Sequence, residues 1–339
     1  MFELFWVFSS GFVVSLLMMF FLRQWALRSR RLVVIRNDSP EKSGVDRIVI
    51  VGGIGIAVSL WFSLFLGRIF FGAGLDQGTA VVLASSVMLI FGILDDLREH
   101  SVAQKFILQL LCATLLVVGN VRTHIIYFGE WENIVITLVW ILGITNAYNL
   151  LDIMDGLSAG AGLAAASGFL VISFIHPDLN VQMLSLGLCA AVSGFLVFNM
   201  PPARIYLGNA GSHFLGFIIA ALALLVSYAT PQRPLSLISP IIILWLPLLE
   251  VAVLIYFRLK KGVIPFYKSN DHMALKLSAL GLSRTGSLGL MLGLALFFSL
   301  CGVMIVKVST PIAWVVIGVV VMVSLIMFWV LRKAEKSVR

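Results

Sequence analysis

Residues 311–331 read PIAWVVIGVVVMVSLIMFWVL, an apolar run without a charged side chain. About 20 such residues form a helix long enough to cross the hydrocarbon core of a bilayer. The rest of the 339-residue chain has a similar character, because 60% of its residues are hydrophobic and only 12% are charged. Soluble domains carry about 25% charged residues, and the mean hydropathy here is +1.05. The sequence therefore predicts a protein that crosses a membrane several times and excludes an ordinary soluble domain.

Apolar runs of this kind recur along the chain and predict eleven membrane helices. The expected ranges are 4–22, 48–66, 79–94, 104–119, 133–151, 157–175, 181–199, 212–229, 236–257, 285–306 and 311–331. Backbone groups inside a bilayer must be hydrogen bonded within the chain, which favours helices. The apolar–polar alternation of a membrane β-barrel is absent. We expect an all-α polytopic membrane protein in which residues 1–339 form one domain without internal repeats.

Lysine and arginine are divided unequally between the two sets of loops. If the eleven spans alternate, 20 of the 24 basic residues lie on one side, most of them in 23–47, in 258–284 and in the C-terminal tail. Cytoplasmic loops are enriched in basic residues, so we expect the N-terminus outside and the C-terminus in the cytoplasm. The net charge of +8 then reflects membrane topology rather than a nucleic acid partner.

Acidic residues gather at the expected cytoplasmic ends of two spans. Asp95 and Asp96 end the third span, and Asp152 and Asp155 end the fifth. Asn149 precedes Asp152 by three residues, so a helix would place it on one face with the second pair. Adjacent carboxylates need a cation or a proton to offset their repulsion, and hard oxygen ligands suit Mg²⁺. The acids indicate a site for Mg²⁺ and phosphate; the alternative is a solvated loop whose acids pair with the nearby arginine.

A glycine-containing segment opens the eighth span. Gly208 and Gly211 flank its start, where backbone N–H groups can approach an anion at the positive end of the helix dipole. Helix packing is the alternative role for these glycines.

The segment 258–284 is a long polar loop on the expected cytoplasmic side. Its His272 and Lys276 can donate to phosphate oxygens, and a positive-inside signal with attraction to anionic lipid is the alternative for its lysines. We expect residues 271–282 to form a short helix at the membrane interface, since their apolar side chains share one face.

Four segments in order resemble one family of membrane transferases. They read VGGIG at 51–55, GILDD at 92–96, NAYNLLDIMDGL at 146–157 and LGNAGS at 207–212. The chain resembles the polyprenyl-phosphate N-acetylhexosamine-1-phosphate transferases, which include the phospho-MurNAc-pentapeptide translocase and the undecaprenyl-phosphate GlcNAc-1-phosphate transferase. The resemblance covers nearly the whole chain. It implies transfer of a sugar-1-phosphate from a UDP-amino sugar to a polyprenyl phosphate held in the lipid bilayer, with release of UMP and with Mg²⁺, or Mn²⁺, as cofactor.

The resemblance also implies roles for single residues. It implies catalytic roles for Asp95, Asp96, Asp152, Asp155 and His272, of which one of the first two would deprotonate or position the polyprenyl phosphate. It implies substrate-binding roles for Lys105, Asn149, Tyr206 and Lys276. We expect a single transmembrane catalytic domain. Its expected cytoplasmic active-site loops lie near 23–47, 95–105, 152–156, 200–211 and 258–284.

The chain departs from the family pattern at two places. The family has Gly-Asp in the fourth segment, where the aspartate binds Mg²⁺, and this chain has Asn209. The implied metal ligands are therefore Asn209, Asp95 and Asp96, with one negative charge fewer, since an amide oxygen is neutral. The family's His-x-His-His run is reduced to His272 with Lys276 as a substitute cation, which makes a MurNAc-pentapeptide substrate less favoured.

Two other functions are compatible with the sequence. Glu250 stands within a late span near Pro247, as an ion-binding acid at a broken transporter helix would. Loss of the fourth-segment aspartate is also compatible with a weakened, lipid-binding homologue. If the chain is the transferase, we expect it to catalyse the first step in the synthesis of a cell-envelope glycan, such as lipopolysaccharide or O-antigen. We then expect a multi-pass protein of a bacterial inner membrane, with its active site at the cytoplasmic face and with a homodimer as a possible assembly.

Overall fold

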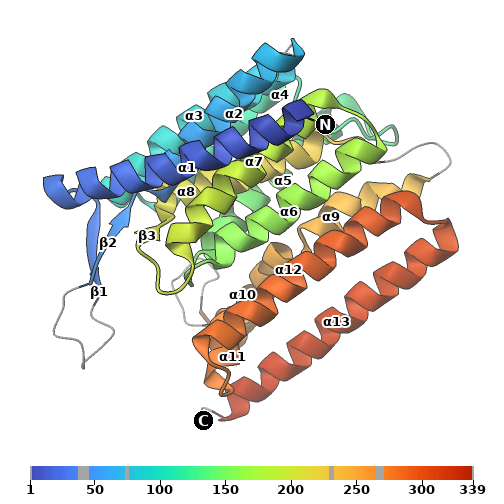
Figure 1. The fold of residues 1–339 in the computed structure, drawn as a ribbon. Helices are drawn as coiled ribbons and strands as arrows, with labels where there is room; N and C mark the ends of the chain where they lie inside the picture. The colour runs from blue at the N-terminus through green and yellow to red at the C-terminus, as the bar shows by residue number, and fades with distance from the viewer. Residues whose placement is uncertain (1, 37–45, 73–75, 229–232, 264–270, 338–339) are drawn as a thin grey trace.

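The computed structural model describes residues 2–36, 46–72, 76–228, 233–263 and 271–337, which form a bundle of long helices with one small sheet (Figure 1). The helices are α1 (Phe2–Ser29), α2 (Gly52–Phe71), α3 (Asp76–Leu97), α4 (Val102–Val118), α5 (Glu130–Leu151), α6 (Leu157–Ile175), α7 (Leu179–Asn199), α8 (Gly208–Leu225), the 3-10 turn η1 (Pro234–Ile238), α9 (Ser239–Ile243), α10 (Trp245–Lys260), α11 (Met273–Ala279), α12 (Arg284–Lys307) and α13 (Thr310–Ser337). The strands are β1 (Val33–Arg36), β2 (Asp46–Ile50) and β3 (Ile205–Tyr206).

The helices confirm the all-α polytopic class. Within the described part of the chain, nine helices are long and apolar enough to cross a membrane. A tenth crossing results if Pro234–Ile243 and Trp245–Lys260, which meet at 67°, act as one broken span. The remaining expected span, α4, is a shorter apolar helix of 17 residues. Each of the eleven expected segments therefore contains a helix, while the number that cross the membrane stays a prediction.

The bend between α9 and α10 has a local cause. Pro247 lies in the first turn of α10 and has no N–H, so it cannot donate to the carbonyl of Ile243. The helix is interrupted at Leu244, between these two positions. The span that contains Pro247 is therefore broken, and the break divides it near its middle.

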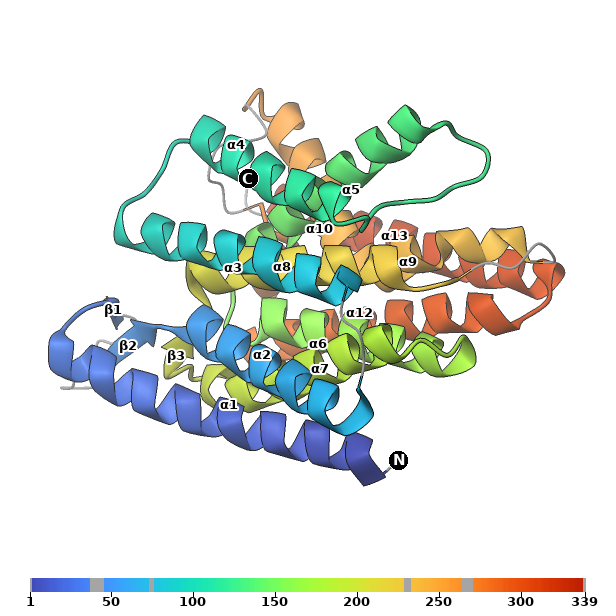
Figure 2. The ribbon, with the colours of Figure 1, turned by 90° about the horizontal axis from the view of Figure 1, so that it is seen from above.

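Helix α8 forms the centre of the bundle. Of the residues in its apolar window, 78% are buried, and it packs against α2, α3, α5 and α6 (Figure 2). Close packing depends on small residues, as is common in membrane bundles: a Cβ on Gly216 would lie 2.9 Å from the Cα of Thr145 on α5. Neighbouring helices thus surround α8 on several sides.

A three-stranded sheet, which the sequence did not predict, joins two segments that are far apart in the chain. β1 and β2 are antiparallel, and β2 pairs in parallel with β3, Val49 opposite Ile205 and Ile50 opposite Tyr206. The sheet brings the VGGIG segment against the start of α8, where a Cβ on Gly53 would lie 2.4 Å from the backbone nitrogen of Gly211. Gly53 and Gly211 therefore allow close helix packing. For Gly211, helix packing was the alternative to anion binding.

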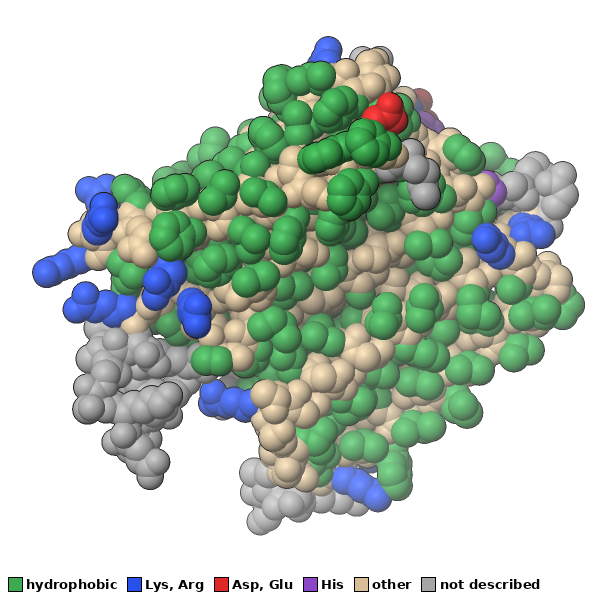
Figure 3. Space-filling view, viewed as in Figure 1, with side chains coloured by type: hydrophobic (Ala, Val, Ile, Leu, Met, Phe, Trp, Pro, Cys, Tyr) green, Lys and Arg blue, Asp and Glu red, His purple; other side chains and the backbone are tan. Residues whose placement is uncertain are grey.

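The surface seen in Figure 3 is covered largely by hydrophobic side chains, as expected for a face in contact with lipid tails. Lysine and arginine side chains gather at the end where α1 meets the sheet. This asymmetry agrees with the charge difference between the two sets of loops, and places the sheet at the basic end of the bundle.

Candidate active site

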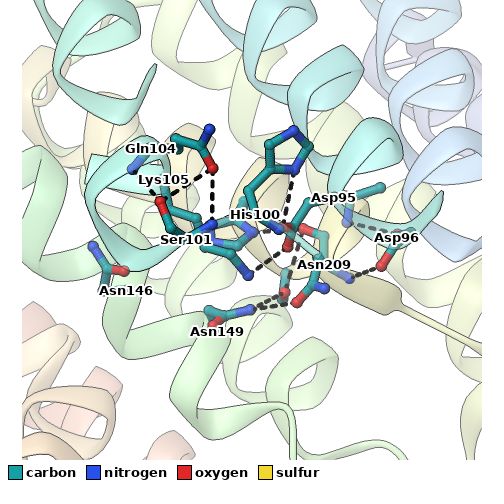
Figure 4. Close-up of polar contacts among 12 residues, drawn as sticks. Asp95, Asp96, His100, Ser101, Gln104, Lys105, Asn146, Asn149 and Asn209 are labelled. Atoms are coloured by element: carbon teal, nitrogen blue, oxygen red, sulfur yellow. Dashed lines mark hydrogen bonds and ion pairs between the residues drawn. The ribbon is translucent and has the colours of Figure 1, made fainter. Parts of the chain in front are cut away.

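Asp95 is a buried carboxylate with both oxygens occupied. It is 3% exposed and lies in the last turn of α3. One oxygen accepts a hydrogen bond of 2.9 Å from the backbone N–H of His100, and the other is 2.6 Å from Nζ of Lys105 (Figure 4). Lys105 is held in place because Ser101 and Gln104 form a capping box at the start of α4. Lys105 therefore lies beside the aspartate pair, with its charge balanced by Asp95.

Asp96 caps the first turn of α8. Its two oxygens accept hydrogen bonds from the backbone N–H groups of Asn209 (2.8 Å) and Ala210 (3.0 Å). Gly208 has φ +73°, and a Cβ there would lie 2.8 Å from a carboxylate oxygen of Asp96, so this turn requires glycine. We expected these N–H groups to be available to a substrate anion. In the structure, the anion at this helix terminus is the carboxylate of Asp96.

Asn149 connects α5 to the same turn of α8. Its amide donates to Oδ1 of Asn209 (3.2 Å) and to the hydroxyl of Ser212 (2.9 Å). One turn earlier, Asn146 donates to Gln109 of α4 at 2.6 Å. Asn209 is therefore bonded on both sides, through its backbone to the α3 aspartate and through its side chain to α5.

Asp152 lies just beyond the end of α5. Burial raises its pKa to about 7, and the negative charges of Asp96 and Asp155 raise it further in the same direction. Its carboxylate accepts no hydrogen bond from any residue that the structure describes. The two acidic pairs thus lie close enough to influence each other, and Asp152 is the carboxylate at which uncompensated negative charge collects.

Asp155 is not on a common helical face with Asn149 and Asp152. Helix α5 ends at Leu151, Asp152 is its C-cap, and Asp155 lies in the turn before α6. One oxygen of Asp155 accepts a hydrogen bond of 3.1 Å from the backbone N–H of Ala203. The helical arrangement considered from the sequence is wrong, because this turn is folded back to contact the segment before β3.

The charge pattern is suited to a divalent cation that the substrate helps to bind. The raised pKa of Asp152 reflects burial and negative charge that either a proton or a cation can offset. Carboxylate and amide oxygens suit Mg²⁺. Among the described residues, no three His, Cys, Asp or Glu side chains are grouped closely enough to hold a metal alone. Mg²⁺ commonly uses one or two carboxylates together with substrate phosphates. The residues therefore fit a metal that arrives with a phosphorylated ligand.

The start of α11 holds two more of the predicted residues, His272 as its N-cap and Lys276 within the helix. Lys276 is 8% exposed, lies 3.1 Å from Asp271 and stacks on the ring of Phe257 at 3.8 Å. Burial raises the pKa of Asp271, but hydrogen bonds from Lys261 and Lys276 outweigh it, so this pKa lies below its usual value. Lys276 is thus paired with Asp271, just before α11, and its role toward a substrate stays a prediction.

His272 and Tyr206 were predicted from the sequence to belong to the site of the aspartates. The structure shows the following neighbours for them. Nδ1 of His272 lies 2.8 Å from the carboxylate of Glu250, and residues 273–279 form the expected short helix, α11. Tyr206 is half-buried in β3, directly before α8. His272 is therefore paired with Glu250 of α10.

Two histidines near the aspartates were not predicted. His100 lies 3.3 Å from Asp95 through Nδ1. His213 is 1% exposed, and its Nδ1 lies 2.8 Å from the carbonyl of Asn209, one turn earlier in α8. The i to i+4 spacing of Asn209 and His213 could have revealed the second contact.

A cavity of about 440 Å³ lies elsewhere, at the opposite end of α5. It is lined by the start of α5, the end of α8 and residues such as Arg122, His124 and Tyr228. None of the four aspartates lines it, so it is separate from the acidic site.

The contact between α3 and α8 gives a direct test of the packing. A Cβ on Gly92 would lie 2.4 Å from the Cα of Ala210, and backbone atoms cannot move aside cheaply. We expect Gly92→Ala to destabilise the protein by about 1–3 kcal/mol, seen as a lower thermal unfolding midpoint in detergent. Gly143→Ala is the matched control, because that Cβ meets nothing within 4 Å. Equal midpoints for both variants would show that α3 and α8 are not in close contact.

Comparison with known proteins links this geometry to one family. The model of glycosyl transferase family 4 matches residues 78–227. A probable undecaprenyl-phosphate N-acetylglucosaminyl 1-phosphate transferase of Bacillus subtilis is 28% identical, over 87% of this chain and 84% of the relative. An undecaprenyl-phosphate alpha-N-acetylglucosaminyl 1-phosphate transferase of Escherichia coli O157:H7 is 24% identical over 78% and 73%. A phospho-N-acetylmuramoyl-pentapeptide-transferase of Shouchella clausii is 31% identical over 56% and 65%.

The matched region begins in α3 and ends after α8, so it contains the four aspartates, Asn149 and Asn209. Of these, Asp96, Asn149 and Asn209 are joined by hydrogen bonds at the first turn of α8, and Asp152 lies near enough for its charge to interact with that of Asp96. The agreement between the motifs, the multi-pass helical fold and the relatives leads to one conclusion: over residues 78–227 the chain resembles glycosyl transferase family 4.

Proposed function

We propose that this membrane enzyme transfers N-acetylhexosamine-1-phosphate from a UDP-linked sugar to a polyprenyl phosphate, releasing UMP. Two of the relatives named above are, by name, undecaprenyl-phosphate N-acetylglucosaminyl 1-phosphate transferases, which supports this acceptor. The observation that carries the proposal is the meeting of Asp96 and Asp152, from α3 and from the end of α5, at the first turn of α8.

The reaction joins two anionic reactants. An oxygen of the polyprenyl phosphate attacks the sugar-bearing phosphorus of the UDP-sugar, a new phosphorus–oxygen bond forms, and the bond to the UMP oxygen breaks. Asp152 is suited to take the proton of the acceptor phosphate, since its pKa lies near 7 and its carboxylate carries no hydrogen bond from the described residues. Lys105, beside Asp95, is suited to contact phosphate oxygens.

Mg²⁺ is the cofactor that this arrangement suits best. We propose Asp96 and Asn209 as its ligands, with Asp152 adding negative charge nearby, because the partners of Asp96 are neutral backbone N–H groups whereas Asp95 is paired with the positive charge of Lys105. A bound Mg²⁺ would offset the negative charge of the diphosphate and of the departing UMP. Asn149 keeps the amide oxygen of Asn209 oriented, so the neutral side chain at position 209 remains usable as an oxygen ligand.

Purified protein tests the proposal. We expect UMP when undecaprenyl phosphate and Mg²⁺ are supplied with one member of a panel of UDP-N-acetylhexosamines, and a polyprenyl-diphosphate sugar when the lipid product is analysed by mass spectrometry. Omission of the lipid should abolish UMP release. Failure of every nucleotide sugar to give UMP would contradict the proposal.

Asn209→Asp tests the metal assignment. A carboxylate at this position adds a negative charge beside Asp96 and Asp152, which favours a divalent cation. We expect the Mg²⁺ concentration for half-maximal activity to fall, by about tenfold for a gain of about 1.4 kcal/mol. An unchanged Mg²⁺ requirement in this variant would show that residue 209 is not a ligand.

Two alternatives receive less support. The transporter reading rested on Glu250, which the structure pairs with His272 and with the backbone of Met273. The weakened homologue rested on Asn209, which is bonded to Asn149 in an ordered site. Uptake of a UDP-sugar by proteoliposomes without UMP release would favour the transporter.

The proposed location follows from charge. With the basic end of the bundle in the cytoplasm, the acidic site faces the compartment that holds UDP-sugars, in a bacterial inner membrane. This placement suits the first step of a cell-envelope glycan. The N-terminus outside, the eleventh span and a homodimer remain part of the proposal.

A further inference from the structure

Glu250 is an acidic side chain completely shielded from solvent. It lies in the second turn of α10, after the bend in the broken span, and is 0% exposed. A carboxylate inside a membrane bundle is costly unless it is paired, and such residues are usually functional. The transferase chemistry described above does not use Glu250, so its presence requires a separate explanation.

Both oxygens of Glu250 are directed at the first residues of α11. Oε1 lies 2.8 Å from Nδ1 of His272. The backbone N–H of Met273 donates to both oxygens, at 3.3 and 3.2 Å. His272 is the N-cap residue of α11 and has no side-chain capping bond of its own. Glu250 therefore fixes the start of α11 and the orientation of the His272 ring.

The other charges of this loop are paired with one another. Asp271 is 2.6 Å from Lys261 and 3.1 Å from Lys276, and the buried charge of Arg258 interacts with both Asp271 and Glu250. His272 is a direct hydrogen-bond partner of Glu250. A carboxylate can only accept a hydrogen bond, so the ring must carry hydrogen on Nδ1. The orientation that results leaves Nε2 as the ring atom able to contact a ligand.

We propose that Glu250 is a positioning residue that acts through His272, holding the ring so that Nε2 meets a phosphate oxygen of the substrate. The arrangement is the one by which a carboxylate fixes the tautomer and the orientation of a working histidine. The proposal rests on the proposed transferase function for its ligand, a phosphorylated reactant. It assigns a catalytic contribution to an acid far from the four aspartates in sequence.

A double-mutant cycle tests the coupling. Glu250→Gln keeps the volume and a hydrogen-bond acceptor but removes the charge; we expect kcat to fall about 10–100-fold with KM unchanged. His272→Ala should lower kcat by about 10²–10⁴-fold. Because Glu250 acts through the histidine, the double variant should be no slower than His272→Ala. Multiplicative losses in the double variant, or full activity of Glu250→Gln, would overturn the proposal.

Two matched controls separate positioning from stability. Glu132→Gln makes the same chemical change at an exposed site in the first turn of α5 and should keep wild-type activity. His272→Asn preserves a short polar group that can reach Glu250 but lacks Nε2, whereas His272→Gln extends an amide toward the position of Nε2. Greater activity in His272→Gln than in His272→Asn supports the proposal, and the reverse order contradicts it.

Nuclear magnetic resonance of ¹⁵N-histidine-labelled protein gives a readout that needs no activity. The His272 signal, assigned by its loss in His272→Ala, should show a hydrogen on Nδ1 in the wild type and should shift in Glu250→Gln. An identical His272 signal in both proteins would overturn the positioning role. If the wild type releases no UMP while the signal behaves as expected, the transferase function fails and the Glu250–His272 pair stands.

Discussion

Asp96→Asn should reduce UMP release by about 10²–10⁴-fold while leaving the protein folded. The carboxylate accepts two backbone N–H groups at the start of α8, and an asparagine can accept with its single oxygen only. Its amide would face the second N–H group, and the negative charge beside Asp152 would be lost. Initial rates with saturating UDP-sugar and polyprenyl phosphate measure the effect.

Asp178→Asn is the matched control for this prediction. Asp178 also caps a helix, since its side chain accepts from the backbone N–H of Val181 at the start of α7. Asparagine is as good an N-cap as aspartate, so activity should be retained. A similar loss in both variants, or normal rates in Asp96→Asn, would show that the carboxylate at position 96 serves the helix and not the reaction.

Asp152→Asn should abolish the reaction and yet make the metal-free protein more stable. The pKa of Asp152 is raised from 3.8 to about 7, so between these values the folded state holds a proton that the unfolded state has released. Stability from this group is present in full below pH 4 and is lost as the pH rises through 7. Asparagine stays neutral, so its advantage should grow between pH 5 and pH 7 and then level off.

Thermal unfolding in EDTA across this pH range measures the difference. Each kcal/mol of stability corresponds to about 2–4 °C in the unfolding midpoint for a chain of this general size. Added Mg²⁺ should narrow the gap in midpoint between Asp152→Asn and the wild type, because it stabilises the ionised wild type. A gap that is constant from pH 5 to pH 8 would mean that Asp152 has an ordinary pKa, and that the two acidic pairs do not interact.

The membrane helices could be predicted because their signal is local. Each apolar run contains a helix, and within the described residues nine of these helices are long and apolar enough to cross a bilayer. The bend beside Pro247 also has a local cause, the missing N–H of proline. The position of the aspartates at helix ends was also evident, since polar residues interrupt the apolar runs there. These features need no knowledge of distant partners.

The internal order of the site depends on distant residues and was predicted less well. Asp96 receives its hydrogen bonds from residues 113 and 114 positions later, and Asp155 is fixed by Ala203. For this reason the prediction that Asn149, Asp152 and Asp155 share one helical face was wrong. β3 is a two-residue strand and leaves no alternating pattern that would announce the sheet.

The loop after α10 illustrates the same limit. From the sequence, Lys276 was a cation for phosphate or for anionic lipid, and the structure pairs it with Asp271, five residues earlier. The contact between Glu250 and His272 spans 22 residues and includes seven, 264–270, outside the described ranges. Only the fold shows that the acid and the histidine belong together.

The central claim is that acids from α3 and from the end of α5 form one site at the first turn of α8. Mn²⁺ binding, followed by electron paramagnetic resonance in the presence of UDP, tests it most directly. We expect one Mn²⁺ to bind per chain. Asp96→Asn and Asp152→Asn should each weaken the affinity for Mn²⁺, and the double variant should bind Mn²⁺ no more weakly than the single variants. Two Mn²⁺ sites, each sensitive to only one of the two aspartates, would contradict the claim.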